Sequence, residues 1–566
     1  MILVKGIGIS SGREMGTVHK LVSIDFKPIN KHIDAVSVED EKKRVLHAFE
    51  ESITQLEEIV KKNKDDKDMC DIIRAHVEIL KDPAMKKKVM GIIEKNRSCA
   101  EDAIYEVVEE FATMMEGLDD EYMRERAADI RDVGKRLFRT LLGFSEKPLN
   151  VSSVVVADDL TPSILSSIDR KYVKAIVSGT GGKTSHIAIM ANGMGIPAIA
   201  GLGRKVDQIK DGDTLIVDGK NGIAYVNPDA ETTNRYLKAK TIDRKEEQER
   251  LKFVDKKAIT EDGIRQVQVC ANIAFLNECD AAKSAGAEGI GLYRTEFLYM
   301  DSNDWPDEET QFQAYKSVLQ TMAPNPVVIR TMDIGGDKGL SYMNLEKEDN
   351  PFLGYRAIRI SLGKPEIFKT QLRALLRASI FGELRIMFPM ISSLPELMDA
   401  KEYVRECKDE LRQEQIDYDD TVKIGIMIEV PAAAVMADTL ASEVDFFSIG
   451  TNDLTQYTMA ADRMNNHVAE IYDYFQPAVL HLINFVIDAA HKHGKTAGMC
   501  GEMAGSEKAI RLLVGMGLDE FSMSAGSILR FKSNIAKFNY DEAKEIAQRC
   551  LACKTCAEVH EILRRG

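Results

Sequence analysis

The second half of the chain alternates short apolar runs with segments of helical periodicity. Parallel strands that are buried on both faces read as continuous apolar runs, whereas strands with one wet face alternate apolar and polar residues. Eight units of strand followed by helix predict a (β/α)8 barrel over residues 258–566. The expected strands are residues 267–271, 289–293, 327–331, 384–388, 424–429, 446–449, 496–499 and 520–523.

The expected carboxyl ends of these strands carry most of the polar side chains that suggest chemistry. Reactive groups of such barrels cluster at this end. Guanidinium forks suit phosphate and carboxylate groups, and carboxylates suit Mg²⁺, so the sequence predicts a site for a small polyanion with a metal ion. Any single arginine could instead form a structural ion pair. The candidates are Arg294, Arg330, Asp333, Glu429, Asn452, Asp453, Cys500 and, in the loop after the sixth strand, Arg463.

The thiol of Cys500 needs a separate explanation. An unperturbed cysteine has a pKa of about 8.5, so at neutral pH the thiol is mostly protonated. A positioned thiol of this kind could give a proton to a carbanion-like carbon.

A glycine-rich segment, SGTGGKTSHIAIM at residues 178–190, follows an apolar run at 173–177 and precedes residues with helical spacing. His186 is therefore expected in the first turn of a helix. There the backbone N–H groups and the helix dipole favour a neutral, nucleophilic imidazole and would stabilise a phosphate attached to it. Two alternatives remain: a phosphate-binding P-loop, in which Val177 would replace the first glycine, and a histidine that merely caps the helix.

The first 230 residues predict an α/β domain with an insertion. Residues 2–9 read as a strand, and strand signals resume at 154–157, 173–177, 214–217 and 223–226. Between them, residues 36–142 have the periodicity of charged amphipathic helices. We therefore expect a helical subdomain at 36–142 within an α/β domain at 1–230, followed by a charged linker helix at 231–257.

Composition narrows the class of protein. A chain of 566 residues with 44% hydrophobic and 29% charged residues is typical of a multidomain globular protein. The formal charge of −15 argues against nucleic-acid binding and suits a basic protein partner. No signal peptide or membrane-length apolar run is evident, so we expect a cytoplasmic protein without membrane insertion.

Nine scattered cysteines favour a reducing compartment over a disulfide framework. The group Cys550, Cys553, Cys556 and His560 resembles a zinc-binding pattern, but on one helix these spacings would spread around the surface. We therefore predict no zinc site there.

Eight segments stand out along the chain: GGKTSH, GIGLYRTEF, RTMDIGGDK, NPFLGYRAIR, IEVPAAA, FFSIGTNDLTQY, DRMN and GMCGEMAG. Together they resemble Enzyme I of the bacterial sugar phosphotransferase system, the family of phosphoenolpyruvate-protein phosphotransferases, and the resemblance spans essentially the whole chain. It implies that His186 takes the phosphoryl group of phosphoenolpyruvate and passes it to a histidine of the carrier protein HPr, with release of pyruvate.

The resemblance also implies roles for the barrel residues and the domains. Glu429 and Asp453 would hold Mg²⁺, Cys500 would protonate the enolate, and Arg356 is a further candidate for the anion site. The domain that carries His186 would swivel, the insertion would bind HPr, and the barrel would form a homodimer. The residues that would bind phosphoenolpyruvate are Arg294, Arg330, Asn452, Asp453 and Arg463.

The chain departs from the family beside the histidine. The family has GGRTSH followed by Thr or Ser, whereas this chain has Lys183 before and Ile187 and Ala188 after His186. Lysine keeps the positive charge but loses the bidentate fork. Two alternative functions remain: a relative such as pyruvate phosphate dikinase or phosphoenolpyruvate synthase, which needs a further nucleotide-binding domain, and a non-catalytic regulator, which predicts loss of a catalytic residue.

Overall fold

The computed structural model divides the chain into two compact units, Met1–Arg244 and Lys245–Gly566. The structure describes residues 1–565 apart from 11, 22–25, 35–36, 63–66, 118–120, 145–148, 161–163, 165–167, 183–186, 188–190, 192–194, 301, 303, 337–339, 341, 344–347, 464 and 466. Among the helices described, none combines the length and the apolar character that a membrane span requires.

The first unit is built on a mixed sheet of eight described strands. The four strands β3, β4, β5 and β6 are parallel, and the remaining pairings are antiparallel. In sheet order the strands are β1 (Ile2–Lys5), β8 (Ile223–Val226), β7 (Thr214–Asp218), β3 (Arg13–Lys20), β4 (Ser153–Ala157), β5 (Val173–Ser178), β6 (Ala198–Ala200) and β2 (Ile7–Ser10).

Both faces of this sheet are covered near its centre. Val154 and Val156 of β4 belong to one apolar cluster, whereas Val155 and Ala157 belong to another. Since successive strand residues point to opposite faces, the two clusters lie on the two sides of the sheet. This explains why β4 reads as a continuous apolar run.

The prediction of one strand over residues 2–9 was wrong. The segment forms two strands at opposite ends of the sheet order: β1 pairs with β8, and β2 pairs with β6. The break falls at Gly6, where a Cβ atom would lie 2.5 Å from the carbonyl oxygen of Ala200. The next strand, β3, was not predicted because its sequence, REMGTVHK, lacks an apolar run.

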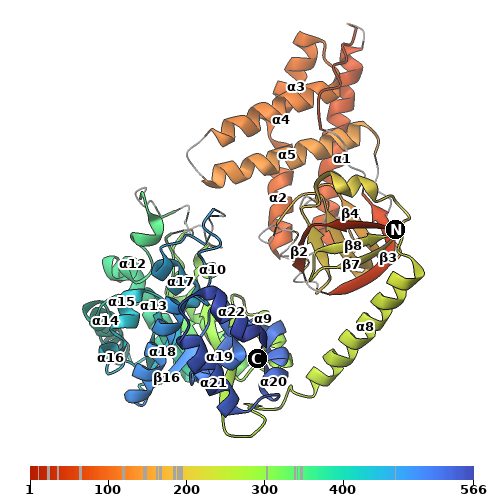
Figure 1. Ribbon diagram of the computed structural model, residues 1–566. Coiled ribbons are helices and arrows are strands. Elements are labelled where there is room, and N and C mark those ends of the chain that lie inside the picture. Colours follow the sequence, from red (N-terminus) through yellow and green to blue (C-terminus); the bar gives the residue numbers. More distant parts are fainter. Residues whose placement is uncertain are drawn as a thin grey trace. The chain divides into compact units, whose positions relative to one another are not determined.

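A helical bundle is inserted between β3 and β4 (Figure 1). Its five described helices are amphipathic and share a core of their own, in which Phe49, Leu56, Ile73 and Leu137 are fully buried. The bundle agrees with the helices expected between residues 36 and 142. Its helices are α1 (Val38–Lys62), α2 (Lys67–Lys81), α3 (Pro83–Asn96), α4 (Ala100–Glu116) and α5 (Glu121–Leu141).

Helix α8 (Ala230–Leu251) leaves the first unit and enters the second. Asp229 caps its start, because its Oδ1 accepts a hydrogen bond from the Thr232 backbone N–H at 2.8 Å. Only Thr232 and Tyr236 of this helix are buried. The helix ends at Leu251, whereas the linker was expected to extend to residue 257.

The second unit is a closed barrel of eight parallel strands, as predicted. Closure follows from β10, which pairs with both β11 and β17. A short strand, β9 (Ala258–Ile259), adds antiparallel to β10. The barrel strands are β10 (Gln266–Ile273), β11 (Ile290–Arg294), β12 (Val327–Arg330), β13 (Leu384–Phe388), β14 (Lys423–Ile428), β15 (Phe446–Ile449), β16 (Thr496–Met499) and β17 (Glu520–Met523).

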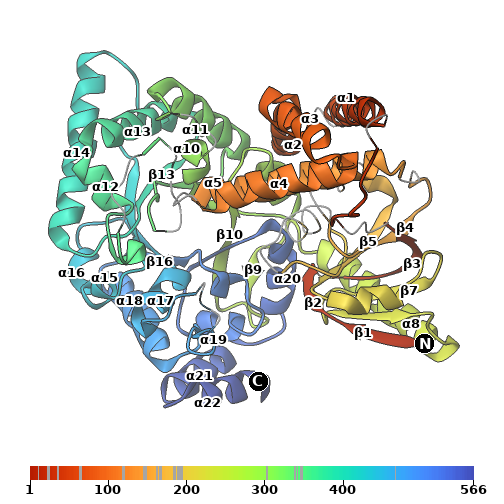
Figure 2. The ribbon, with the colours of Figure 1, turned by 90° about the horizontal axis from the view of Figure 1, so that it is seen from above.

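Helices surround the barrel strands, as Figure 2 shows for α11, α13, α14 and α18. Their apolar faces and the outward residues of the strands form the largest core of the chain. The helices are α9 (Glu278–Ser284), α10 (Glu296–Met300), α11 (Glu308–Met322), α12 (Ile358–Gly363), α13 (Pro365–Ala378), α14 (Leu394–Gln413), α15 (Pro431–Val435), α16 (Ala437–Leu440), α17 (Thr451–Met459), α18 (Pro477–Lys492), α19 (Ile510–Gly515), α20 (Ala525–Ile535), α21 (Tyr540–Leu551) and α22 (Cys556–Arg565).

Side chains fill the interior of the barrel. Residues that alternate with the helix-facing ones form a smaller apolar cluster, which includes Leu292, Val328, Met387 and Phe446. Gly425 leaves room for the Phe446 ring, because a Cβ atom there would lie 2.5 Å from it. The charged residues at the strand ends therefore lie beside an apolar cluster of the barrel interior.

Candidate active site

The carboxyl ends of the barrel strands hold a group of buried charged side chains. Arg330 ends β12, Asp333 follows three residues later, and Glu429 directly follows β14. Asp453 lies in the first turn of α17, which begins immediately after the loop from β15. All four are buried. The barrel topology thus brings together residues that are more than 100 positions apart in the sequence, as the sequence analysis predicted.

Arg330 is held by two carboxylates. Its Nη2 donates to Oε1 of Glu296 at 2.7 Å, and its Nη1 lies 3.0 Å from Oδ2 of Asp333. Burial opposes the charge of Arg330, but Asp333, Glu296 and Glu429 outweigh it and raise the pKa of the guanidinium. Arg330 is therefore charged and fixed in direction at the barrel rim.

Arg356 is the centre of this network. Its Nε and Nη2 lie 3.1 and 3.3 Å from the two oxygens of Asp333, and its Nη1 lies 3.1 Å from both Oδ1 of Asp453 and the hydroxyl of Tyr457. Only 1% of its side chain is exposed. Because protein groups accept its N–H donors, Arg356 positions Asp333 and Asp453.

Glu429 lies in the most unfavourable electrostatic environment of the site. Its side chain is 1% exposed, and its Oε1 accepts a hydrogen bond from the Met390 backbone N–H at 2.6 Å. Burial, followed by the neighbouring charges of Asp453 and Asp333, raises the pKa of Glu429. A divalent cation would relieve this repulsion, and oxygen ligands are those that Mg²⁺ prefers, so the residues present fit such an ion.

The backbone can approach Glu429 closely because residue 450 is a glycine. A Cβ atom at Gly450 would lie 3.1 Å from both Cβ and Oε2 of Glu429. This contact is tighter than an ordinary van der Waals separation. Glycine therefore lets the chain pass the carboxylate just before Asn452 and Asp453.

Three further candidates complete the rim. Nη1 of Arg463 lies 3.7 Å from Oδ2 of Asp453, and Oδ1 of Asn452 accepts from the Glu502 backbone N–H at 3.2 Å. Arg294 is exposed at the end of β11, with its guanidinium 5.1 Å from the centroid of the Phe297 ring. It forms no ion pair with a carboxylate of the described residues, so its charge can meet a ligand anion.

Cys500 directly follows β16 and is 6% exposed. Its Sγ lies 3.9 Å from the carbonyl oxygen of Ile449, and it packs with the apolar cluster inside the barrel. Burial raises the pKa of the Cys500 thiol to about 11, above the value expected for an unperturbed cysteine. The thiol is thus protonated at neutral pH and is a weaker acid than the sequence suggested.

The candidate nucleophile His186 lies outside the described residues, as do Lys183 and Ala188. Ile187 is described and is 3% exposed. It belongs to the apolar cluster on one face of the first unit's sheet, beside residues such as Ile176. Packing therefore accounts for an apolar residue at position 187.

Sequence reasoning missed Glu296, although it binds Arg330 directly. Glu296 lies two residues after Arg294 in the segment GLYRTEF. Its closeness in sequence to Arg294 was the available signal. A search restricted to the ends of strands does not find Glu296, because this residue starts helix α10.

Family models match the chain along most of its length. The model described as "PEP-utilising enzyme, PEP-binding domain" matches residues 246–540, which include the barrel site. The corresponding N-terminal model matches residues 5–126, and the mobile-domain model matches residues 149–222. The fold and the site therefore define an enzyme of the phosphoenolpyruvate-utilising class.

Curated relatives narrow this class. Proteins named "Phosphoenolpyruvate-protein phosphotransferase" are 46% identical in Geobacillus stearothermophilus over 567 residues and 47% identical in Enterococcus faecalis (strain ATCC 700802 / V583) over 575 residues. These alignments cover 99% of this chain and 98% and 99% of the relatives. A third, from Staphylococcus carnosus (strain TM300), is 44% identical over 99% of this chain and 98% of the relative. The chain belongs to the phosphoenolpyruvate-protein phosphotransferase family, whose enzymes use a divalent metal ion.

Proposed function

We propose that this protein transfers the phosphoryl group of phosphoenolpyruvate to its own His186 and then to a histidine of HPr, as the first step of a sugar phosphotransferase system. The observation that carries the proposal is the buried network of Arg330, Arg356, Glu429 and Asp453 at the carboxyl end of the barrel. Burying these charges costs desolvation energy even though they are paired, and strongly perturbed charged groups of this kind cluster at functional sites. Membership of the family supports the same assignment.

The phosphoenolpyruvate ligands in this proposal are Arg294, Arg330, Asn452, Asp453 and Arg463. Two kinds of arginine are present: Arg330 is fixed by Glu296 and Asp333, whereas Arg294 is exposed. A fixed guanidinium provides a preorganised positive charge, and an exposed one can close on the incoming anion.

The metal ion in this proposal is Mg²⁺, with Glu429 and Asp453 as its protein ligands. Held by Glu429 and Asp453, Mg²⁺ would supply positive charge that offsets the negative charge developing during phosphoryl transfer. The raised pKa of Glu429 supports the assignment, since a carboxylate crowded by other carboxylates is favoured in its charged form by a cation.

The chemistry has two transfers and one protonation. In the first transfer, the bond between phosphorus and the enol oxygen breaks as a bond from a His186 nitrogen to phosphorus forms. The enolate left behind takes a proton at carbon from the Cys500 thiol, which gives pyruvate. In the second transfer, the nitrogen–phosphorus bond at His186 breaks and the phosphoryl group passes to HPr.

The domains have separate tasks in this proposal. Residues 1–230 form the swivelling phosphohistidine domain, the insertion at residues 36–142 binds HPr, residues 231–257 are the linker, and residues 258–566 are the phosphoenolpyruvate-binding barrel. The scarcity of buried side chains along α8 supports a linker. We place the protein in the cytoplasm, in keeping with its nine free cysteines, and assign it no nucleic-acid role.

The homodimer in this proposal forms through the barrel. Three neighbouring apolar side chains are exposed: Val435 at the end of α15 by 62%, Met436 directly after it by 45%, and Phe485 of α18 by 45%. They suit a second copy of the chain, because exposed apolar groups at such a place favour association. Sedimentation of Phe485→Ser should show weaker self-association than wild type. Met398→Ser, which changes an exposed residue of α14, is the matched control.

The central test is phosphorylation without a nucleotide. The protein is incubated with phosphoenolpyruvate labelled in its phosphate and with Mg²⁺. Acid-labile label should appear on wild type and on the control His47→Ala, but not on His186→Ala. Added HPr should then remove the label. Label on His186→Ala would exclude His186 as the nucleophile. A requirement for nucleotide would favour a dikinase or synthase.

A second experiment separates the barrel from the HPr site. Glu429→Gln and Asp453→Asn should lower metal-dependent turnover far more than HPr binding, because HPr is assigned to the insertion. The exposed residue Glu470 provides the matched control, Glu470→Gln. Equal losses of turnover and HPr binding in the barrel variants would argue against two sites.

A third experiment asks whether Cys500 is an acid or a packing residue. A positioned general acid contributes about 10²- to 10⁴-fold, so Cys500→Ser should slow turnover. It should also reduce the stereoselectivity with which a 3-substituted phosphoenolpyruvate is protonated in deuterated water. If the variant retains both rate and stereoselectivity, another group or water delivers the proton.

A further inference from the structure

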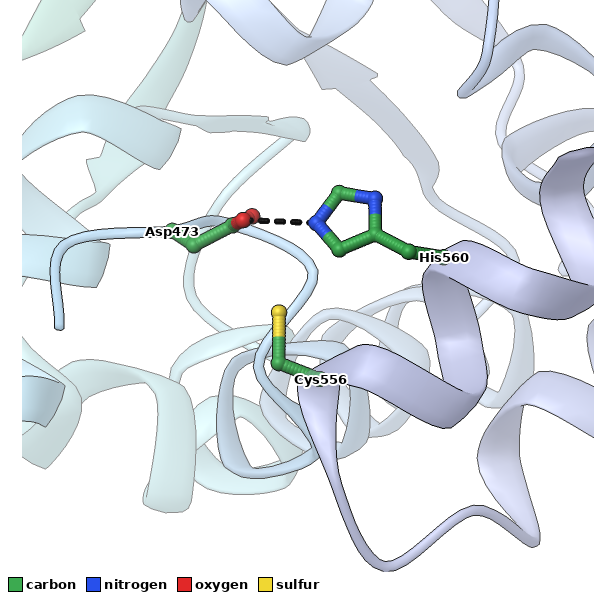
Figure 3. A group of neighbouring side chains, drawn as sticks. All are labelled: Asp473, Cys556 and His560. Atoms are coloured by element: carbon green, nitrogen blue, oxygen red, sulfur yellow. Dashed lines mark hydrogen bonds and ion pairs between the residues drawn. The ribbon is translucent and has the colours of Figure 1, made fainter. Parts of the chain in front are cut away.

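The C-terminal helix α22 presents two metal-ligand side chains on one face. Cys556 and His560 are four residues apart and therefore neighbours on the helix surface. Asp473, from the loop between α17 and α18, points toward them (Figure 3). One ligand atom from each of the three residues lies within 4.8 Å of the other two. The fold thus joins a thiol, an imidazole and a carboxylate from distant parts of the chain.

Neighbouring groups orient two of these ligands. Oδ1 of Asp473 accepts a hydrogen bond from the Phe475 backbone N–H at 2.8 Å, and its Oδ2 lies 2.7 Å from Nε2 of His560. The His560 ring packs edge-on against the Phe475 ring, with centroids 5.0 Å apart and planes at 72°. Outer contacts of this kind fix ligand direction in metal sites.

We propose that Asp473, Cys556 and His560 form a Zn²⁺ site, with a water molecule or one further ligand in the fourth position. Thiolate and imidazole ligands favour Zn²⁺ over the hard cation Mg²⁺, which prefers oxygen ligands alone. Zinc–ligand distances of about 2.0–2.3 Å place tetrahedral donor atoms roughly 3.3–3.8 Å apart. The observed distances bracket this spacing: Nε2 of His560 lies 2.7 Å from Oδ2 of Asp473, and the ligand atoms of all three residues lie within 4.8 Å of one another.

The charges of the site balance. Binding through Nε2 requires loss of the Cys556 thiol proton and the tautomer of neutral His560 that carries its N–H on Nδ1. One thiolate, one carboxylate and one Zn²⁺ then sum to zero. Without metal, burial and the nearby Asp473 raise the pKa of the Cys556 thiol to about 12, so the cation must displace this proton.

The prediction made from the cysteine spacing was partly wrong. It treated Cys550, Cys553, Cys556 and His560 as positions on one helix, whereas α21 ends at Leu551 and α22 starts at Cys556. Cys550 is buried in α21, and Cys553 lies between the helices. The third ligand, Asp473, precedes His560 by 87 residues and could not be found from local spacing.

The site would tie the C-terminal helix to the loop beside the active site. Tyr472, the neighbour of Asp473, donates its hydroxyl to the carbonyl oxygen of Asn452 at 3.2 Å. Asn452 is one of the proposed phosphoenolpyruvate ligands. Zinc at Asp473 would therefore stabilise the far end of a loop that also carries Arg463.

The test uses the full chain after chelation and dialysis. Co²⁺ replaces Zn²⁺ as a visible probe, because a cysteine thiolate gives a charge-transfer band that oxygen ligands do not give. The variants are Cys556→Ser, His560→Gln and Asp473→Asn. The matched controls are Cys553→Ser, Cys500→Ser and His481→Gln, of which Cys500→Ser excludes binding near the proposed Mg²⁺ site.

Wild type should bind one equivalent of Co²⁺ with the thiolate band, and Zn²⁺ should displace it. Cys556→Ser should lose the band, the other two variants should bind at least about tenfold more weakly, and the controls should retain wild-type binding. Zn²⁺ should raise the melting temperature of wild type more than that of Cys556→Ser, whereas any rise caused by Mg²⁺ at the barrel rim should be equal in the two proteins. Absence of both the band and the thermal shift in wild type, or loss of the band in Cys553→Ser or Cys500→Ser with retention in Cys556→Ser, would overturn the proposal.

Discussion

The barrel rim and the helical insertion differ in how far an ion pair is exposed to water. At the rim, the side chains of Arg356 and Asp333 are each 1% exposed and pair at 3.1 Å. In the insertion, Lys81 and Glu57 pair at the same distance but are 48% and 46% exposed. Breaking a buried pair leaves an uncompensated charge, whereas water replaces a broken surface pair. The pair at the proposed catalytic site therefore carries an electrostatic cost of burial that the surface pair does not.

The largest expected effect is that of Arg356→Met, which removes the partner of two buried carboxylates. Such a loss typically costs about 3–5 kcal/mol of unfolding free energy. Turnover should fall by about 10²- to 10³-fold, because Asp333 and Asp453 lose their positions. Trp305 is the single tryptophan and lies in the barrel unit, so its fluorescence during urea unfolding reports on that unit. The control Arg405→Met changes an exposed arginine and should alter both the unfolding free energy and turnover much less.

A substitution in the insertion should lower its stability strongly only when it changes the apolar core. Phe49 is fully buried, so Phe49→Ala should cost about 3–5 kcal/mol in the first unit. Leu46→Ala, which changes an exposed neighbour, should cost less than about 0.5 kcal/mol. Far-UV circular dichroism should show the early unfolding of Phe49→Ala, while Trp305 fluorescence should retain the wild-type midpoint. A shifted fluorescence midpoint would mean that the two units unfold together.

Glu429 should make the barrel less stable as pH rises. In the unfolded chain it ionises near its ordinary pKa of about 4.3, whereas in the folded protein this pKa is raised. Above the unfolded value the folded state therefore binds more protons, and stability falls with increasing pH through the folded pKa.

In chelator, Glu429→Gln should thus gain roughly 1–3 kcal/mol relative to wild type between about pH 5 and pH 8. Trp305 fluorescence in urea is the measurement, and Mg²⁺ should reduce the difference. Glu470→Gln should follow wild type at every pH. A constant difference between Glu429→Gln and wild type would contradict the raised pKa.

The smallest effect should come from the surface pair of the insertion. A double-mutant cycle of Lys81→Ala and Glu57→Ala should give a coupling energy of about 0.2–1 kcal/mol by circular dichroism. Added salt should reduce it further. A coupling above about 2 kcal/mol would remove the contrast between the two regions.

The barrel could be predicted because its strands are locally distinct. The expected runs at 446–449, 496–499 and 520–523 coincide with β15, β16 and β17, since each is a short apolar segment between helices. Strand β3 could not be found in this way, because its residues are mostly half-buried and polar.

The rim residues followed from the barrel, but their partners did not. Positions at strand ends identify Arg330 and Glu429, whereas the contacts of Arg356 with Asp333 and Asp453 depend on loop geometry. The same limit applies to Asp473, which meets His560 only through the packing of α22. Local spacing predicts candidates on one element and misses ligands contributed by another.

The place of the insertion limits how such a chain can be shortened. Strands β3 and β4 are parallel neighbours, with Thr17 opposite Ser153 and Lys20 opposite Val156. Parallel strands need a crossover of a dozen or more residues, which is usually one helix, so the five-helix bundle is an enlarged crossover and not an appended loop. An engineered deletion of residues 36–142 must therefore keep a connection that returns along the sheet. A tight turn in its place would force β4 to reverse and would separate it from β5.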